Sequence, residues 1–147
     1  MIPKTSHILF KRRIVWKSKR ILNRLYHKWY HIIQSAIKPG TTLEIGGGSG
    51  NFKEYFPGAI SSDILFAKWL DAVLDAHHLP FGDETFDNII LFDVLHHLQD
   101  PGFFFGCGKG AETRWTNYND GAQYFIGVFH RLPLLPFRRN VMAYRSV

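Results

Sequence analysis

Apolar residues between positions 18 and 37 recur at steps of three and four, which is the spacing of one face of an α-helix. We predict an amphipathic helix here that ends near Lys38, where Pro39 and Gly40 stop it. A less regular basic stretch that contains Trp16 precedes it over residues 11–19. The apolar face comprises Ile21, Leu22, Leu25, Tyr26, Trp29, Ile32, Ile33, Ala36 and Ile37.

Short apolar runs separated by turn residues follow this helix. Residues 41–45 form a β-branched and apolar run, which predicts a strand. A glycine-rich turn at residues 46–50 and a short helix over residues 51–56 come next. Residues 59–63 predict a second strand that ends in Asp63. The near-continuous apolar run over residues 86–93, which ends in Asp93, predicts a buried parallel strand.

The length of 147 residues suits one domain of ordinary size. With 46% apolar and 20% charged residues, the composition is that of a globular chain and excludes a disordered one. No apolar run reaches the roughly 18 residues of a spanning helix, and we expect no secretory signal. The single cysteine, Cys107, excludes an internal disulfide framework and a multi-cysteine metal site. We therefore expect a cytoplasmic protein.

The net charge of +6 is unevenly distributed along the chain. Residues 1–38 carry ten Lys or Arg and no acid, whereas residues 39–105 carry ten acids and two lysines. The basic helix either packs its apolar face on the domain or contacts an anionic surface. Packing on the domain is the preferred interpretation, and peripheral contact of residues 1–38 with an anionic membrane is the second. Nucleic-acid binding is not expected, because no recognition motif accompanies the charge.

The glycine-rich turn allows a ligand to approach the backbone closely, since side chains would block it. It does not fit the dinucleotide fingerprint G-x-G-x-x-G, which needs a glycine where Asn51 stands. It is not a P-loop either, because no closing G-K-[ST] follows. Instead an acid precedes the turn: Glu44 opens an E-x-G-x-G-x-G pattern with Gly46, Gly48 and Gly50.

This pattern resembles the first motif of the class I S-adenosylmethionine-dependent methyltransferases. Downstream, residues 75–81 are similar to the family's D-A-x-x-L-P-F stretch, and the F-D-x-x-x-x-x-x-V-L-H-H-L string at residues 86–98 is typical of the type 11 subfamily. The matches occur in family order over residues 38–105. The resemblance implies an α/β fold with a Rossmann-like, doubly wound sheet. This chain carries the N-terminal half of that sheet in residues 39–105, after the basic segment 1–38.

The resemblance also implies roles for the residues at the strand ends. Asp63 would accept hydrogen bonds from both ribose hydroxyls of the cofactor, and Asp75 and Ala76 would contact its adenine. The competing interpretation of each single match is structural: a tight turn for the glycines, a helix cap for Asp63 and pairing with a neighbour for Asp75. The implied set for S-adenosyl-L-methionine is Glu44, Gly46, Gly47, Gly48, Gly50, Asp63, Ile64, Asp75, Ala76 and Asp93.

Four histidines lie in two adjacent pairs, His77-His78 and His96-His97. Adjacent residues point to different sides of a strand or helix, so the pairs do not make a ready three-ligand site, and no metal is expected. The resemblance places the second pair near the reactive end of the cofactor, where His96 or His97 could touch the substrate. General-base chemistry by either is compatible with the sequence, and no catalytic residue is assigned.

Residues 106–122 break the resemblance, because the family continues with R-V-L-K-P-G-G and a fifth strand. Codons for Gly108 to Ala122, read from their second base with suitable degenerate positions, encode Glu-Arg-Val-Leu-Lys-Pro-Gly-Gly-Arg-Ile-Ile-Met-Met-Glu-Pro. The single codon of Trp115 must then supply the first two bases of a glycine codon. We therefore hypothesise a frameshift near residues 105–108, which makes 106–147 a non-family tail. The fourth strand would then be an exposed apolar edge.

These features predict a truncated S-adenosylmethionine-dependent methyltransferase that acts on a small-molecule or lipid-linked acceptor. A non-catalytic remnant that still binds the cofactor is the alternative. A nicotinamide-dependent oxidoreductase is third and is disfavoured by Asn51 in the place of the fingerprint glycine. The sequence does not identify the acceptor or the oligomeric state.

Overall fold

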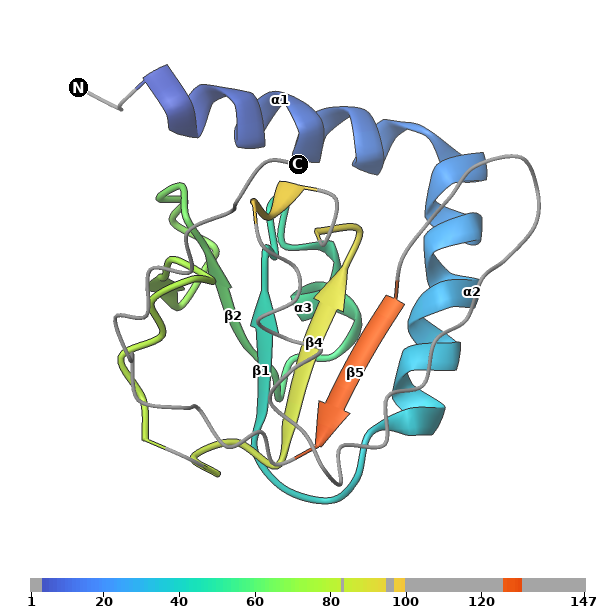
Figure 1. The fold of residues 1–147 in the computed structure, drawn as a ribbon. Helices are drawn as coiled ribbons and strands as arrows, with labels where there is room; N and C mark the ends of the chain where they lie inside the picture. The colour runs from blue at the N-terminus through green and yellow to red at the C-terminus, as the bar shows by residue number, and fades with distance from the viewer. Residues whose placement is uncertain (1–3, 83, 95–96, 100–125, 131–147) are drawn as a thin grey trace, which may run out of the picture.

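The computed structural model describes residues 4–82, 84–94, 97–99 and 126–130. Two helices, α1 (Lys4–Ser18) and α2 (Arg20–Ala36), precede a five-stranded sheet. The strands are β1 (Thr42–Ile45), β2 (Ile60–Asp63), β3 (Ala72–Val73), β4 (Asn88–Phe92) and β5 (Ile126–His130), and the short helix α3 (Asn51–Tyr55) follows β1. Helix α1 lies across the carboxyl ends of the parallel strands, and α2 runs down beside the sheet (Figure 1).

The strands lie in the order β3-β2-β1-β4-β5. The first four are parallel, and β5 is antiparallel to β4. The chain moves outward from β1 to β3 and then returns to β4 on the other side of β1, so the strand order reverses between β1 and β4. This is the order of a Rossmann-like sheet, whose ligands bind at that reversal. The predicted α/β, Rossmann-like fold is confirmed.

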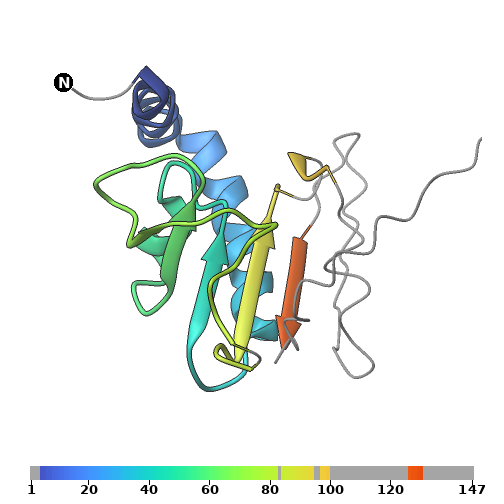
Figure 2. The same ribbon diagram turned by 60° about the vertical axis from the view of Figure 1, so that its left-hand side comes forward.

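One face of the sheet is covered by α2 and α3 (Figure 2). Tyr30 and Ile33 of α2 pack with Phe52 of α3 against Ile90 of β4 in one buried cluster. Most of the apolar side of α2 is therefore used inside the domain, which confirms the packing interpretation of this helix, whereas Ile21, predicted on the same face, is 83% exposed. It ends at Ala36, close to the predicted end, and no side chain caps it at Lys19.

The other face is covered by an irregular segment rather than by a helix. Leu43 of β1 and Leu91 of β4 pack here with Phe86, and Leu74 and Phe81 cover them. Alternate residues of β4 thus point into two separate cores, as the side-chain period of a strand requires. All residues of β1 and β4 are buried.

Helix α1 was not predicted as a regular element. Its apolar residues are spread around the helix, and only Leu9 and Trp16 are buried, so no periodic stripe marks it in the sequence. Within the described residues, no helix has both the length and the apolar character that crossing a membrane requires.

The prediction that the fourth strand forms an exposed edge is wrong. Strand β5 pairs with β4 along its whole length, from Asn88 opposite His130 to Phe92 opposite Ile126. Val128 in β5 is 1% exposed and belongs to the core that α2 and α3 cover. Apart from β5, the predicted tail at residues 106–147 lies outside the described residues.

Candidate functional site

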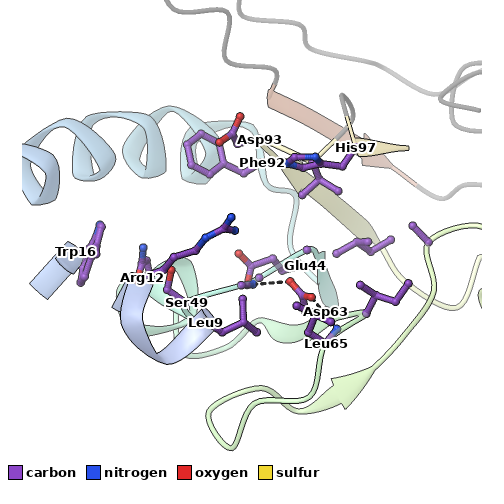
Figure 3. Close-up of a pocket in the computed structure, with 18 of the residues that line it drawn as sticks. Leu9, Arg12, Trp16, Glu44, Ser49, Asp63, Leu65, Phe92, Asp93 and His97 are labelled. Carbon is purple, nitrogen blue, oxygen red and sulfur yellow. Dashed lines mark hydrogen bonds between the residues drawn. The ribbon is translucent and has the colours of Figure 1, made fainter. Parts of the chain in front are cut away.

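A cavity of about 710 Å³ lies at the carboxyl ends of β1 and β4, under α1 (Figure 3). This is the point where the strand order reverses, which is the usual ligand position in open α/β sheets. Leu9, Arg12 and Trp16 of α1 lie on one side of it, and Glu44 and Asp63 lie across from them. The N-terminal helix therefore forms one wall of the cavity, and the strand ends form the other.

The structure brings most of the predicted cofactor residues to this cavity. Nine of the ten line it, namely Glu44, Gly46, Gly47, Gly48, Asp63, Ile64, Asp75, Ala76 and Asp93. Gly50 is not among the lining residues. It precedes α3 with a φ of +72°, and a Cβ there would lie 2.5 Å from the ring of Trp69. Its role is in the turn itself.

Each of the four parallel strands supplies one carboxyl group to the cavity. Glu44 lies in β1, Asp63 ends β2, Asp75 follows β3 and Asp93 follows β4. Parallel strands end at the same edge of a sheet, so the four groups come from one edge of the sheet, which we call the acidic wall of the cavity. Asp93 has a φ of +57°, a left-handed conformation that Asp tolerates better than most residues. This wall suits a ligand that is rich in hydroxyl, amino or cationic groups.

Glu44 is the most buried of the four acids, with 4% of its surface exposed. Its carboxyl group accepts a hydrogen bond from the Ser61 hydroxyl, and its backbone carbonyl accepts one from the Ser62 hydroxyl at 2.8 Å. Burial and, to a lesser degree, the charge of Asp63 raise the pKa of Glu44 to about 7, against the opposing effect of the Ser61 hydrogen bond. Near neutral pH Glu44 is therefore able to donate as well as accept a proton.

The carboxylate of Asp63 closes the glycine turn. Its Oδ2 accepts the Gly48 N–H at 2.9 Å, and its Oδ1 accepts the Leu65 N–H at 2.9 Å. Each oxygen has a second lone pair, so the group can hold the turn and still accept hydrogen bonds from a diol in the cavity. Gly47 leaves no room for a side chain, because a Cβ there would lie 2.2 Å from the Ser61 hydroxyl oxygen.

Two residues that the sequence did not indicate hold the glycine turn from outside. Arg13 of α1 donates to the Ser49 carbonyl and pairs with Glu54, and Trp69 Nε1 donates to the Gly48 carbonyl at 2.9 Å. These partners lie far from the turn in sequence, and no motif marks either side chain. Only the fold reveals them.

The carboxylate of Asp75 is turned toward the histidines that follow it. It accepts the His77 N–H at 2.9 Å, and its oxygens lie 3.1 Å from Nδ1 of His77 and 3.0 Å from Nδ1 of His78. These hydrogen bonds, that of the His77 N–H first, lower the pKa of Asp75 to about 2. Pairing with a neighbour, the structural interpretation of Asp75, is confirmed, although the residue also lines the cavity.

Three buried polar atoms have no hydrogen-bond partner among the described residues: Trp16 Nε1, Asn51 Oδ1 and His77 Nε2. All three residues line the cavity. Buried polar atoms are rarely left unpaired in folded proteins. Unpaired polar atoms therefore occur in three of the residues around this cavity.

Of the second histidine pair, His97 lines the cavity and lies beside Phe92 and Asp93 at its far end (Figure 3). Its backbone N–H donates to the Val94 carbonyl at 2.8 Å. His96 lies outside the described residues. In the described ranges, no three His, Cys, Asp or Glu side chains are placed to hold a metal ion.

Comparison with known proteins agrees with this geometry. Residues 43–105 match the family model described as a methyltransferase domain, type 11. The searches of curated proteins and of solved structures found no match. The matched segment contains all of β1 but its first residue, the glycine turn, β2, β3 and β4. These strands supply the four acids of the cavity. Residues 43–105 of this chain are therefore similar to the type 11 family of methyltransferase domains.

Proposed function

We propose that the cavity binds S-adenosyl-L-methionine and that the protein transfers its methyl group to a small-molecule or lipid-linked acceptor. The observation that supports this most is the position of nine implied cofactor residues around one cavity at the reversal of the strand order. A family match over residues 43–105 supports methyl transfer in general, and the acidic wall supports this particular cofactor.

The residues present fit this cofactor. Its ribose hydroxyls, adenine amine and α-amino group are donors, and the four strand-end acids are acceptors. Asn51 Oδ1 is a buried acceptor without a partner, and His77 Nε2 is another when its Nδ1–H donates to Asp75. Asp63 would hold the ribose, the segment at Asp75 and Ala76 would hold the adenine, and the glycine turn would hold the remaining part.

When bound, the cofactor supplies a methyl group on a sulfonium, which a nucleophilic oxygen, nitrogen or carbon accepts. The protein's part is to orient the two reactants and to exclude water. Tyr26, Tyr30 and Phe92 form an aromatic wall of the cavity, with ring centroids 5.5 Å apart for Tyr26 and Phe92. His97 of the second histidine pair lines the cavity, and we infer that it takes a proton from the acceptor.

Calorimetric titration of the full chain with S-adenosylhomocysteine tests this proposal. We expect binding, and we expect Asp63→Asn to weaken it about tenfold, since the amide loses a charge-assisted acceptor, at a cost of about 1.4 kcal/mol. Asp87→Asn is the matched control, because the Asp87 carboxylate accepts a hydrogen bond from the Thr41 N–H and does not line the cavity. Lack of binding by the wild-type chain would refute the proposal.

A second assay separates the alternatives. Transfer of a tritiated methyl group to an acceptor extract, in addition to binding, supports the methyltransferase. Binding without transfer to any acceptor favours the non-catalytic remnant. Binding of a nicotinamide dinucleotide in place of S-adenosylhomocysteine favours the oxidoreductase.

We also propose that the protein contacts an anionic membrane peripherally, because a lipid-linked acceptor would be located there. Because the apolar side of α2 is buried in the domain, this contact would use α1. Ile8, Phe10 and Ile14 of α1 are about half exposed, on a helix that carries basic residues and no acid. Exposed apolar side chains among basic ones favour an anionic lipid surface.

A further inference from the structure

The two walls of the cavity carry opposite charges. The four lining acids all stand at strand ends, whereas the two lining cations, Lys11 and Arg12, both belong to α1. The acids suit the donor groups of a ligand, and they leave its anionic groups without a partner. The basic wall is the complementary place for such a group.

Arg12 differs from its basic neighbours on the same helix. Arg13 and Lys17 both pair with Glu54, on the side of α1 that faces α3. Arg12 lines the cavity instead and forms no ion pair with any described residue. Its guanidinium can therefore offer paired N–H donors to a ligand.

Trp16 adds a second donor on the same side of α1. It follows Arg12 by four residues, which places both side chains on one face of the helix, and both line the cavity (Figure 3). Trp16 is only 7% exposed, and its Nε1–H has no acceptor among the described residues. A buried indole N–H normally finds an acceptor. The Trp16 N–H and the Arg12 guanidinium come from the same face of α1, so an anionic oxygen in the cavity would pair with both groups.

We propose that Arg12 and Trp16 form an anion-binding subsite in the wall of the cavity, which takes a carboxylate or phosphate group of the bound ligand. The inference rests on the proposed function, because it assigns a part of the same cavity. Leu9 and Val15 of α1 and Leu22 of α2 also line the cavity, so an apolar body attached to the anionic group would find apolar contacts there. Two sources share this chemistry: the carboxylate of the cofactor and an anionic group of the methyl acceptor.

The test uses two pairs of probes on the full chain. S-adenosylhomocysteine is compared with 5′-methylthioadenosine, which lacks the amino-acid carboxylate. Phenyl phosphate is compared with phenol. The variants are Arg12→Gln, which removes the charge, and Trp16→Phe, which keeps an aromatic ring and removes the N–H. Arg24→Gln is the control, because it removes the same charge from an exposed position that does not line the cavity.

We expect both variants to bind one anionic probe about fivefold or more weakly than the wild type does. The affinity for its neutral counterpart should change by less than about twofold. A selective loss for S-adenosylhomocysteine assigns the subsite to the cofactor carboxylate, and a selective loss for phenyl phosphate assigns it to the acceptor. Unchanged affinity for both anionic probes overturns the subsite, and so does an equal loss for the neutral probes, which indicates a general structural effect. If the wild type binds neither adenosine compound, the proposed function fails, and phenyl phosphate still tests the subsite.

Discussion

The guanidinium of Arg13 lies 4.8 Å from the centre of the Trp69 ring, and each of these two side chains also holds one carbonyl of the glycine turn. Arg13 donates to the Ser49 carbonyl, and Trp69 Nε1 donates to the Gly48 carbonyl at 2.9 Å. Phe10 of α1 contacts the same indole, with ring centroids 6.5 Å apart. Helix α1 thus contacts the backbone that faces the cavity, and we expect ligand affinity to depend on how this helix packs.

Replacing Trp69 by Phe tests that coupling. The ring and its contact with Arg13 are retained, but the Gly48 carbonyl loses its donor. We expect S-adenosylhomocysteine to bind about fivefold more weakly, which corresponds to the roughly 1 kcal/mol of one hydrogen bond. Calorimetric titration gives the affinity, and thermal unfolding confirms that the variant is folded.

Phe66→Leu is the control for Trp69→Phe, because Phe66 is 58% exposed and does not line the cavity. It should leave the affinity unchanged. Equal affinities of Trp69→Phe and wild type would show that the indole hydrogen bond does not position the turn.

Glu44 makes the stability of the domain depend on pH. Its pKa is about 7 in the folded protein, chiefly because of burial, against 4.5 for an ordinary glutamate. Between these values the folded state binds more protons than the unfolded state, so the free energy of unfolding falls as the pH rises. The loss from pH 4.5 to pH 8 is on the order of 3 kcal/mol. Urea unfolding at several pH values measures it.

Glu44→Gln is expected to remove this dependence, since a neutral amide has no proton to lose. The variant gains stability relative to wild type as the pH rises from 5 to 8. Asp75, whose pKa is lowered to about 2 by its hydrogen bonds from His77 and His78, does not confound the result. Its contribution is present above its ordinary pKa of 3.8 and is lost only as the pH falls toward 2. Parallel curves for Glu44→Gln and wild type would show that Glu44 is already ionised in the folded state.

The sequence contains enough local information to locate the acidic wall. The glycines, the acid before them and the apolar runs lie within short segments, so strands β1, β2 and β4 could be predicted from residues 41–93. Parallel strands then bring Glu44, Asp63 and Asp93 to one edge without further information. The orientation of the Asp75 carboxylate toward His77 could not be predicted in this way, because it depends on the local turn geometry.

The basic wall and the edge strand could not be predicted. Helix α1 has no apolar stripe, and its Arg13 contacts Ser49 across 36 positions of the chain. Strand β5 pairs with β4 although no family motif lies near Val128. Both depend on contacts between segments that are distant in the sequence, and the local pattern of apolar residues does not predict such contacts. Arg13, Trp16 and Trp69 were therefore missed as residues of the site.

The proposed contact of α1 with an anionic membrane can be tested separately. Ile8→Ser combined with Ile14→Ser should lower the affinity for phosphatidylglycerol vesicles, measured by co-sedimentation, about thirtyfold, because each side chain that enters the membrane contributes about 1 kcal/mol. Val73→Ser is the control, since Val73 is as exposed as Ile14, at 53% each, and belongs to β3 rather than to α1. Vesicle binding that is equal in the double variant and wild type would exclude α1 as the contact.

The frameshift hypothesis predicts the nucleotide sequence of the gene. Across the codons for residues 108–122, the frame shifted by one base should encode Lys-Pro-Gly-Gly followed by an apolar strand that ends in Glu-Pro. Physical chemistry gives the reason to expect that strand: a buried parallel strand such as β4 needs a partner on each side. In this chain, β5 occupies that side in the antiparallel direction. Sequencing of the gene across codons 100–147 decides between the two frames. Codons that do not encode the family continuation in the shifted frame would establish residues 106–147 as the genuine product. Strand β5 would then be the strand that covers the edge of β4 in this protein.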